Sequence, residues 1–133
     1  MKLFSKKDIG FLGEDAAARH LKKQGYKLLN RNCQCGKNEL DLVMRDGRYI
    51  VFVEVKSLTF ECSEDSLKRR PSMAVNMAKR RRTVEAMRYY LQEHPTNLIP
   101  RLDVIEIYLN RSTNKPFKVN HIPDAFGADG SLH

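Results

Sequence analysis

Three acidic residues and one lysine are spaced along two neighbouring apolar segments so that they could converge. Glu39 and Asp41 begin the first segment, and Glu54 and Lys56 stand in the second half of the other. Between the segments lies an Asp-Gly pair at 46–47, which is typical of a two-residue β-hairpin turn. Because side chains alternate between the two faces of a strand, this hairpin would place three carboxylates and one ammonium group on the same face.

The turn also predicts which of these charges face each other. With Asp46 and Gly47 at its centre, Glu39 lies opposite Glu54, and Asp41 lies one diagonal step away, roughly 7–8 Å between backbone positions. Like charges placed so close destabilise a sheet unless something neutralises them. Lys56 can neutralise one carboxylate, and a divalent cation would neutralise the rest. An unbulged hairpin therefore predicts a metal site.

A further carboxylate occupies the apolar side of the first predicted helix, residues 5–24, which Ser5 or Asp8 would cap and Gly25 would end. Glu14 falls in the middle of that side on a 3.6-residue wheel. A carboxylate directed at the core is costly unless it is paired, protonated or bound to metal. A buried ion pair with an arginine or lysine is the structural alternative. The apolar side consists of Phe11, Ala17, Ala18 and Leu21.

The remaining pattern predicts one α/β domain, with a mixed, mainly five-stranded sheet flanked by two helices. Both faces of the second hairpin strand are apolar, which favours a central strand covered on both sides. We expect the domain to span residues 1–126 and a disordered tail to span 127–133. The other predicted elements are strands at 27–34, 101–110 and 117–122, the hairpin at 39–57, and a helix at 77–93 capped by Asn76.

Composition favours a polyanionic partner. The net charge is +8 at neutral pH and the pI is about 9.6, which suits nucleic acid or an anionic membrane, with simple solubility as the alternative. No apolar run is long enough to span a membrane, and the first residues do not form a signal peptide, so we expect a cytoplasmic protein. The candidate nucleic-acid-binding cations, which could also form a solvated basic face, are Lys68, Arg69, Arg70, Lys79, Arg80, Arg81 and Arg82.

The carboxylates define a candidate chemistry. Asp41, Glu54 and the carbonyl of Val55 offer the oxygen ligands that Mg²⁺ prefers, with Mn²⁺ as the other candidate. A cation held there would polarise a phosphoryl oxygen and lower the pKa of water. Lys56 could orient or deprotonate that water and stabilise charge on phosphorus. This is the set that phosphodiester hydrolysis needs. The three cysteines lack the spacing of a redox or zinc motif and are expected to be reduced thiols.

Asp41 followed by Glu54-Val55-Lys56 resembles the D…(D/E)xK signature of restriction-endonuclease-like nucleases, whose scaffold Holliday junction resolvases share. The whole chain resembles the YraN-like family of small bacterial proteins more closely. The matching elements are Gly10–Ala17, Gly25-Tyr26, Asn32, Glu39–Leu42, Val51–Lys56, Lys79, Arg101–Val104 and Ala125-Phe126.

The resemblance implies a restriction-endonuclease-like fold and a Mg²⁺-dependent endonuclease-like protein acting on DNA, with branched or structured DNA as a candidate substrate. It implies Glu14, Asp41, Glu54 and Lys56 as catalytic residues, the three carboxylates as metal ligands, and a homodimer by analogy. Two alternatives stay open: a non-catalytic nucleic-acid-binding module that keeps the fold, and an adaptor that binds another protein.

Three positions depart from the family pattern. Asn38 stands where the family usually has glycine, and asparagine tolerates a left-handed backbone that such a turn could need. Ser57 stands where an arginine commonly follows the lysine. Leu102 replaces a usual phenylalanine, which changes packing. None of the three removes a proposed catalytic group. Asp103 also falls on an apolar face, where it could pair with a buried arginine.

Overall fold

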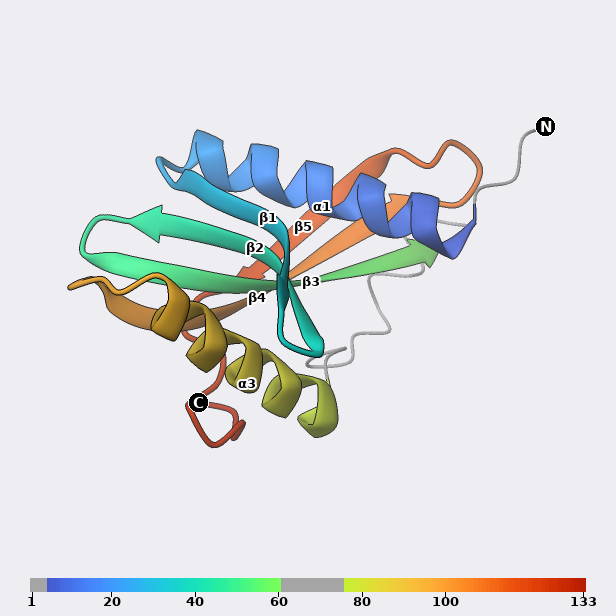
Figure 1. Ribbon diagram of the computed structural model, residues 1–133. Helices are drawn as coiled ribbons and strands as arrows, with labels where there is room; N and C mark the ends of the chain where they lie inside the picture. Colours follow the sequence, from blue (N-terminus) through green and yellow to red (C-terminus); the bar gives the residue numbers. More distant parts are fainter. Residues whose placement is uncertain (1–4, 61–75) are drawn as a thin grey trace.

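The computed structural model describes residues 5–60 and 76–133 and shows a five-stranded sheet with one helix on each face (Figure 1). The strands lie in the order β1-β2-β3-β4-β5, with β3 parallel to β4 and every other neighbouring pair antiparallel. The predicted mixed α/β class is confirmed, with β3 at the centre of the sheet. The elements are α1 (Lys6–Lys23), β1 (Lys27–Cys35), β2 (Asn38–Asp46), β3 (Tyr49–Phe60), α3 (Met77–Glu93), β4 (Ile99–Asn110) and β5 (Pro116–Ile122).

Polar caps explain where both helices begin. The Ser5 side chain accepts a hydrogen bond from the Asp8 backbone, and the Asp8 carboxylate accepts one from the Ser5 backbone, so the two residues form a reciprocal capping box. Asn76 caps α3 through its bond from the backbone of Lys79. Gly25 follows α1 at a φ of +96°, a conformation that glycine adopts without strain. None of the described helices is long and apolar enough to cross a membrane.

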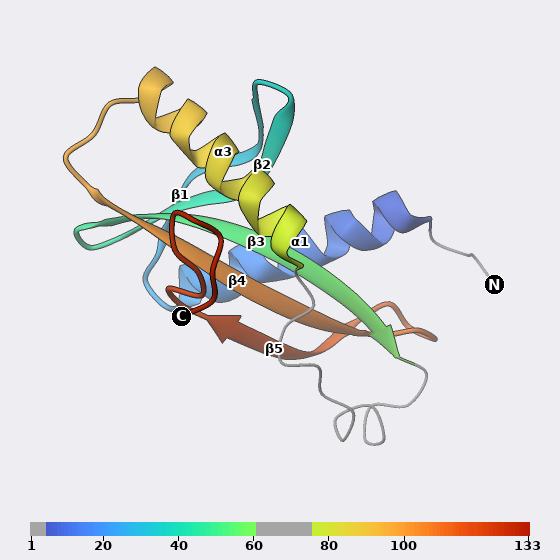
Figure 2. The same ribbon diagram turned by 90° about the horizontal axis from the view of Figure 1, so that it is seen from below.

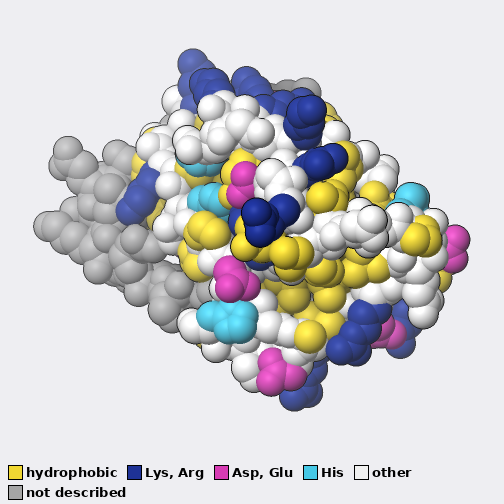
Figure 3. Space-filling model, turned by 90° about the vertical axis from the view of Figure 1, so that its left-hand side faces the viewer, with side chains coloured by type: hydrophobic (Ala, Val, Ile, Leu, Met, Phe, Trp, Pro, Cys, Tyr) yellow, Lys and Arg dark blue, Asp and Glu magenta, His cyan; other side chains and the backbone are white. Residues whose placement is uncertain are grey.

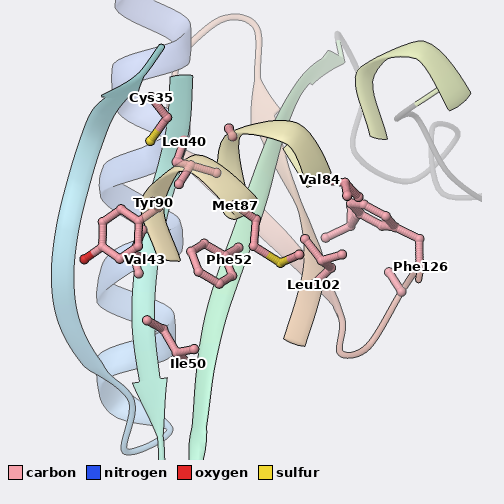
Figure 4. Close-up of a cluster of buried hydrophobic side chains, with 13 residues drawn as sticks. Cys35, Leu40, Val43, Ile50, Phe52, Val84, Met87, Tyr90, Leu102 and Phe126 are labelled. Carbon is pink, nitrogen blue, oxygen red and sulfur yellow. The ribbon is translucent and has the colours of Figure 1, made fainter. Parts of the chain in front are cut away.

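Each helix covers one face of the sheet and builds one half of the core. The α1 face buries Ala17 and Leu21 against residues of β2, β3 and β4 such as Val53 and Ile105. On the other face, Val84, Met87 and Tyr90 of α3 point toward the sheet (Figure 4). Because both faces are apolar, β3 is covered on both sides as predicted. The residues that α3 meets include Val43, Ile50, Phe52, Leu102 and Phe126.

The central hairpin has a different register from the predicted one. Gly47 and Arg48 form the turn, Gly47 adopts a φ of +59°, and Asp46 pairs with Tyr49. Glycine at the first central position is what a type II′ turn requires, so this turn is favoured over one centred on Asp46 and Gly47. The pairing consequently moves by two residues, which leaves every side chain on its predicted face. Glu39 pairs with Gln34 of β1 and not with Glu54.

The turn between β1 and β2 corrects the expectation for Asn38. The left-handed residue there is Gly36, at a φ of +63°, and Asn38 already belongs to β2, paired with Cys35. Asn38 therefore needs no special conformation.

The C-terminal residues fold back, whereas the sequence predicted a disordered tail at 127–133. Phe126 forms a bridge with Leu132, and the backbone of His133 donates to the carbonyl of Ala125. The buried Arg80 of α3 donates to the carbonyl of Gly130 at 2.7 Å. These contacts satisfy polar backbone groups that a free tail would leave to water, so the segment closes one end of the core.

Candidate active site

The candidate site lies where β2 and β3 separate. Their ladder ends at Leu42 and Val53, after which β3 runs on beside β4 to Phe60 while the first residues of β2 stay with β1. The tip of the β1–β2 hairpin and the end of β3 consequently point apart (Figure 2). Such a split frees side chains that a continuous ladder would pack against neighbours.

A cleft of about 640 Å³ opens at this split. The structure brings all four residues predicted to be catalytic to its wall: Glu14 from α1, Asp41 from β2, and Glu54 and Lys56 from β3. A second cavity of about 340 Å³ shares Asp41 with the cleft and is lined by Glu39. In the observed register, the position that follows the Leu42–Val53 pair places Asp41 opposite Glu54. Glu39, which was predicted to face Glu54, lines this second cavity instead.

Asp41 and Glu54 are held by polar contacts from β3 and α3. Asp41 Oδ2 accepts a bond of 2.9 Å from the backbone nitrogen of Val55, which ties β2 to β3 where their ladder has ended. Glu54 is only 4% exposed, and its Oε2 accepts a bond of 3.0 Å from Thr83 Oγ1 of α3. The other oxygen, Oε1, lies 3.4 Å from Lys79 Nζ. Thr83 was not among the residues predicted from the sequence, where its only signal is its place one turn after Lys79.

Burial and mutual repulsion oppose ionisation of the carboxylates that line the cleft. Burial and the neighbouring Asp41 carboxylate raise the pKa of Glu54 to about 8, although Lys79 and Thr83 favour the charged form. Burial also raises the pKa of Asp41, against the hydrogen bond from Val55. Burial and the Asp41 carboxylate raise the pKa of Glu14. Additional positive charge would stabilise all three as carboxylates.

Glu14 reaches the cleft because α1 approaches β3 closely. A Cβ atom on Gly13 would collide with Ser57 Oγ and lie 3.0 Å from Ser57 Cβ, so a larger residue fits there only if Ser57 moves. The neighbouring Glu14 Oε1 lies 3.9 Å from Arg31 Nε of β1. The arginine pair that we gave as the structural alternative is therefore present, at a long distance, while the same carboxylate lines the cleft.

Lys56 is exposed and follows Glu54 and Val55 along the cleft wall. Its neighbour in the parallel register of β4 is Glu106, a fully buried carboxylate that accepts a 2.8 Å bond from Asn120. Lys56 is thus open to solvent beside the buried Glu54, where an incoming anion could reach it.

The predicted basic residues divide between different roles. Lys79 pairs with Glu54, and Arg82 is exposed at the cleft. Arg81 is exposed, whereas Arg80 is buried and bonded to Gly130, so its guanidinium holds the C-terminal loop and does not join Arg81 and Arg82 at the surface. Lys and Arg side chains are also spread over the face shown in Figure 3, at its centre as well as along its edges. The remaining predicted cations, Lys68, Arg69 and Arg70, lie outside the described residues.

Asp103, which the sequence also placed on an apolar face, belongs to a structural network. Its two oxygens accept bonds of 2.9 Å from Arg101, and His121 Nε2 lies 2.7 Å from Oδ2. Burial opposes ionisation, but the bonds from His121 and Arg101 keep the pKa of Asp103 below its usual value. Arg101 also donates to Asp46 and to the Tyr26 hydroxyl, so the network joins β2, β4 and β5 away from the cleft. The predicted pairing with an arginine is confirmed.

The donor atoms of the cleft suit a hard divalent cation. Asp41 and Glu54 offer carboxylate oxygens, and Mg²⁺ is often held by one or two carboxylates while it keeps several waters. Among residues 5–60 and 76–133, no group of three or more His, Cys, Asp or Glu side chains is arranged to hold a metal ion. The predicted third ligand, Glu14, therefore does not complete a preformed three-carboxylate cluster. The fit rests on the oxygen atoms of this pair and on the cost of ionising two neighbouring buried carboxyl groups without a cation.

Comparison with known proteins identifies the family. Residues 13–107 match the model of "Uncharacterised protein family UPF0102". The chain belongs to the UPF0102 family. It is 40% identical over 127 residues to a UPF0102 protein of Caldanaerobacter subterraneus subsp. tengcongensis, covering 95% of this chain and all of the relative. It is 38% identical over 126 residues to one of Caldicellulosiruptor saccharolyticus, covering 92% and 99% respectively.

A UPF0102 protein of Clostridium perfringens is 37% identical over 127 residues, with coverage of 95% of this chain and 98% of the relative. The family part of the predicted resemblance is thus confirmed. The region that matches the UPF0102 model begins at Gly13, the close contact of α1 with β3, and includes Glu14, Asp41, Glu54 and Lys56.

Proposed function

We propose that this UPF0102 protein is a metal-dependent nuclease that hydrolyses phosphodiester bonds of DNA. The observation that carries the proposal is the convergence of Glu14, Asp41, Glu54 and Lys56 on one cleft, where burial raises the pKa of the neighbouring Asp41 and Glu54. A bound cation would keep these buried carboxylates ionised. The pair is therefore suited to binding a metal ion that also contacts a substrate phosphate. The proposed restriction-endonuclease-like fold is supported by the order of the described elements: one helix, three strands, a second helix and two further strands.

Each side chain has a role that follows from its place. Asp41 and Glu54 would hold Mg²⁺ or Mn²⁺, which when bound supplies positive charge to the phosphoryl oxygen and acidifies water. Glu14 would accept a hydrogen bond from the attacking water. The exposed Lys56 ammonium would stabilise the charge that develops on phosphorus. Water adds to phosphorus, one P–O ester bond breaks, and a proton moves to the leaving oxygen.

The surrounding cations support a polyanionic substrate. Arg82 lines the cleft from α3, and Lys37 and Arg82 line the adjoining cavity. Contacts of this kind to phosphates position a nucleic acid without reading its sequence. The net charge of +8 would add a salt-dependent attraction.

Metal-dependent stabilisation is the first test. Titration of Mg²⁺ or Mn²⁺ into the purified protein should raise its melting temperature, because a cation that binds only the folded state stabilises it. Asp41→Asn and Glu54→Gln should abolish the rise and also abolish cleavage of a panel of duplex, flap and branched DNA. Glu85→Gln removes one exposed carboxylate of α3 away from the cleft and serves as the matched control. Wild-type protein that cleaves nothing in this panel with either metal would contradict the proposal.

A non-catalytic nucleic-acid-binding module is the second candidate. The bonds from Lys79 and Thr83 to Glu54 favour it, since they already occupy both oxygens of that carboxylate. This candidate predicts salt-sensitive DNA binding that survives Asp41→Asn and Glu54→Gln, with no metal effect on melting temperature and no cleavage.

A further inference from the structure

Phe11 is the exception among the apolar residues of α1. The sequence placed it on one side of the helix with Ala17, Ala18 and Leu21, and those three are buried as predicted. The Phe11 side chain is 58% exposed, more than any other large hydrophobic side chain of the described residues. Exposed aromatic surface of this size brings no burial energy to the fold, so its place calls for another explanation.

The ring is held in position by Arg31 of β1. The guanidinium carbon of Arg31 lies 4.8 Å from the ring centroid, within the range of a cation–π contact. The same guanidinium donates to the Phe11 carbonyl at 3.4 Å and lies 3.5 Å from Asp15. One side of the ring is therefore occupied by a cation, while more than half of the side chain remains open to solvent.

Arg31 also connects the ring to the cleft. Its Nε lies 3.9 Å from Glu14, a carboxylate of the cleft wall, and Ile9 and Gly10, which directly precede Phe11, line the same cleft. A molecule whose phosphate reaches Lys56 and the carboxylate pair would thus have a flat aromatic surface at the rim of the site.

A nucleotide combines these two chemical features, since it carries an anionic phosphate and a flat base. Bases stack on exposed aromatic side chains in proteins that bind single strands, where the stacking tolerates any sequence. A base inside a duplex already has both faces stacked and must leave the helix to reach such a surface. The combination of Phe11 and the cleft consequently selects a base that is unpaired.

We propose that Phe11, held by Arg31, is a stacking platform for an unpaired nucleobase next to the cleavage site, so that the substrate is DNA with a single-stranded segment. The inference rests on the proposed function, because it takes the cleft as the place where the phosphate binds. It adds a specificity-determining residue and a substrate class to that function.

Binding of single-stranded and duplex oligonucleotides carrying 2-aminopurine tests the platform. The protein would be studied as Asp41→Asn, to prevent cleavage, with and without a second change at Phe11. Loss of the ring in Phe11→Ala should weaken single-strand binding about tenfold and reduce the quenching of 2-aminopurine, with less than about a twofold effect on duplex. Phe11→Tyr should retain both, and Phe11→Leu, which keeps an apolar side chain, should not.

Two controls separate stacking from other effects. Tyr89→Ala removes another exposed aromatic ring, 43% exposed on α3 and outside the cleft, and should leave single-strand binding unchanged. Sedimentation of wild type and Phe11→Ala shows whether the ring instead joins two copies of the chain. A change in oligomeric state with unaltered single-strand binding would overturn the inference.

Failure of the inference differs from failure of the proposed function. One result would be cleavage by the wild type that is lost in Asp41→Asn but unaffected by Phe11→Ala on both single-stranded and duplex substrates. That result would refute the stacking platform and support the proposed nuclease activity. Wild-type protein that neither binds nor cleaves any oligonucleotide would refute both the stacking platform and the proposed function.

Discussion

Asp41 Oδ2 accepts a 2.9 Å hydrogen bond from the backbone nitrogen of Val55, the residue between Glu54 and Lys56. A side chain of β2 thus replaces a backbone bond to β3 just beyond the last ladder pair, Leu42 with Val53. The Asp41 carboxylate therefore has two functions: it links β2 to β3 beyond the end of their ladder, and it is one of the acidic groups of the cleft. Substitutions can separate these functions.

Two changes at Asp41 should have different effects on the metal-free protein. Asp41→Asn keeps an oxygen that can accept from Val55 and removes a buried charge, so stability should stay level or rise. Asp41→Ala leaves the Val55 backbone nitrogen without its partner and should lower the free energy of unfolding by ~1–3 kcal/mol. Urea denaturation in EDTA measures both, and equal losses would contradict the structural function of the hydrogen bond.

Stability without metal should fall as the pH rises. The pKa of Glu54 is raised from 4.5 to about 8 in the folded protein, so folding favours its proton. This stabilisation is fully present below the unfolded value and is lost as the pH rises through the folded value. Glu54→Gln removes the titrating group and should flatten the pH dependence of urea denaturation between about pH 5 and pH 8. Unchanged dependence in the variant would assign the titration to another group.

Lys79 should stabilise the fold more than its neighbour Arg82. Lys79→Met removes the cation 3.4 Å from the buried Glu54 carboxylate, and breaking a buried pair is costly. Because Lys79 itself is 42% exposed, solvent screens part of this, and we expect a loss of ~1–2 kcal/mol. Arg82→Met changes an exposed position and should stay within about 0.5 kcal/mol. Thermal and urea denaturation above pH 8, where Glu54 is ionised, compare the two; similar losses would argue against a specific role of the pair.

Two glycines of α1 should respond to alanine in opposite directions. Gly10 has no atom within 4 Å of an added Cβ, so Gly10→Ala should stabilise the helix by ~0.5–1 kcal/mol. Gly13→Ala meets Ser57 and should destabilise the protein by ~1–3 kcal/mol by forcing α1 away from β3. Loss of cleavage should accompany it because Glu14 moves with the helix.

The double variant Gly13→Ala, Ser57→Gly removes the clashing side chain and should recover much of both losses. Denaturation and cleavage assays of the same preparations test this rescue. Failure of Ser57→Gly to restore stability would place the conflict elsewhere on α1.

Arg80 should anchor the C-terminal loop. Arg80→Met removes the 2.7 Å bond to the Gly130 carbonyl and should cost ~1–3 kcal/mol, with faster proteolysis between Phe126 and His133. Limited proteolysis followed by mass spectrometry locates the cleavage. Equal protease resistance in wild type and variant would show that the loop is held by its backbone bridge alone.

Much of this architecture is readable from local sequence. The helix predicted at 77–93 agrees with α3 at both ends, because an asparagine cap, an apolar stripe and a following proline act over a few residues. The central position of β3 follows from apolar side chains on both of its faces. The candidate site residues could also be predicted from the sequence, because a carboxylate on an otherwise apolar face of a helix or strand is costly to bury and therefore stands out.

The partners of those residues depended on contacts between distant parts of the chain. Turns centred on Asp46-Gly47 and on Gly47-Arg48 keep the same faces, so alternation could not show that Asp41, and not Glu39, stands with Glu54. Burial periodicity likewise assigned Phe11 to the core, because a helical wheel cannot show where the strands lie beneath each turn of the helix. Glu14 and Glu54 belong to opposite faces of the sheet, and only the separation of β2 from β3 lets both reach one cleft. Residue type and local period thus define the inward-facing charges, whereas long-range strand pairing and helix packing determine which of them meet.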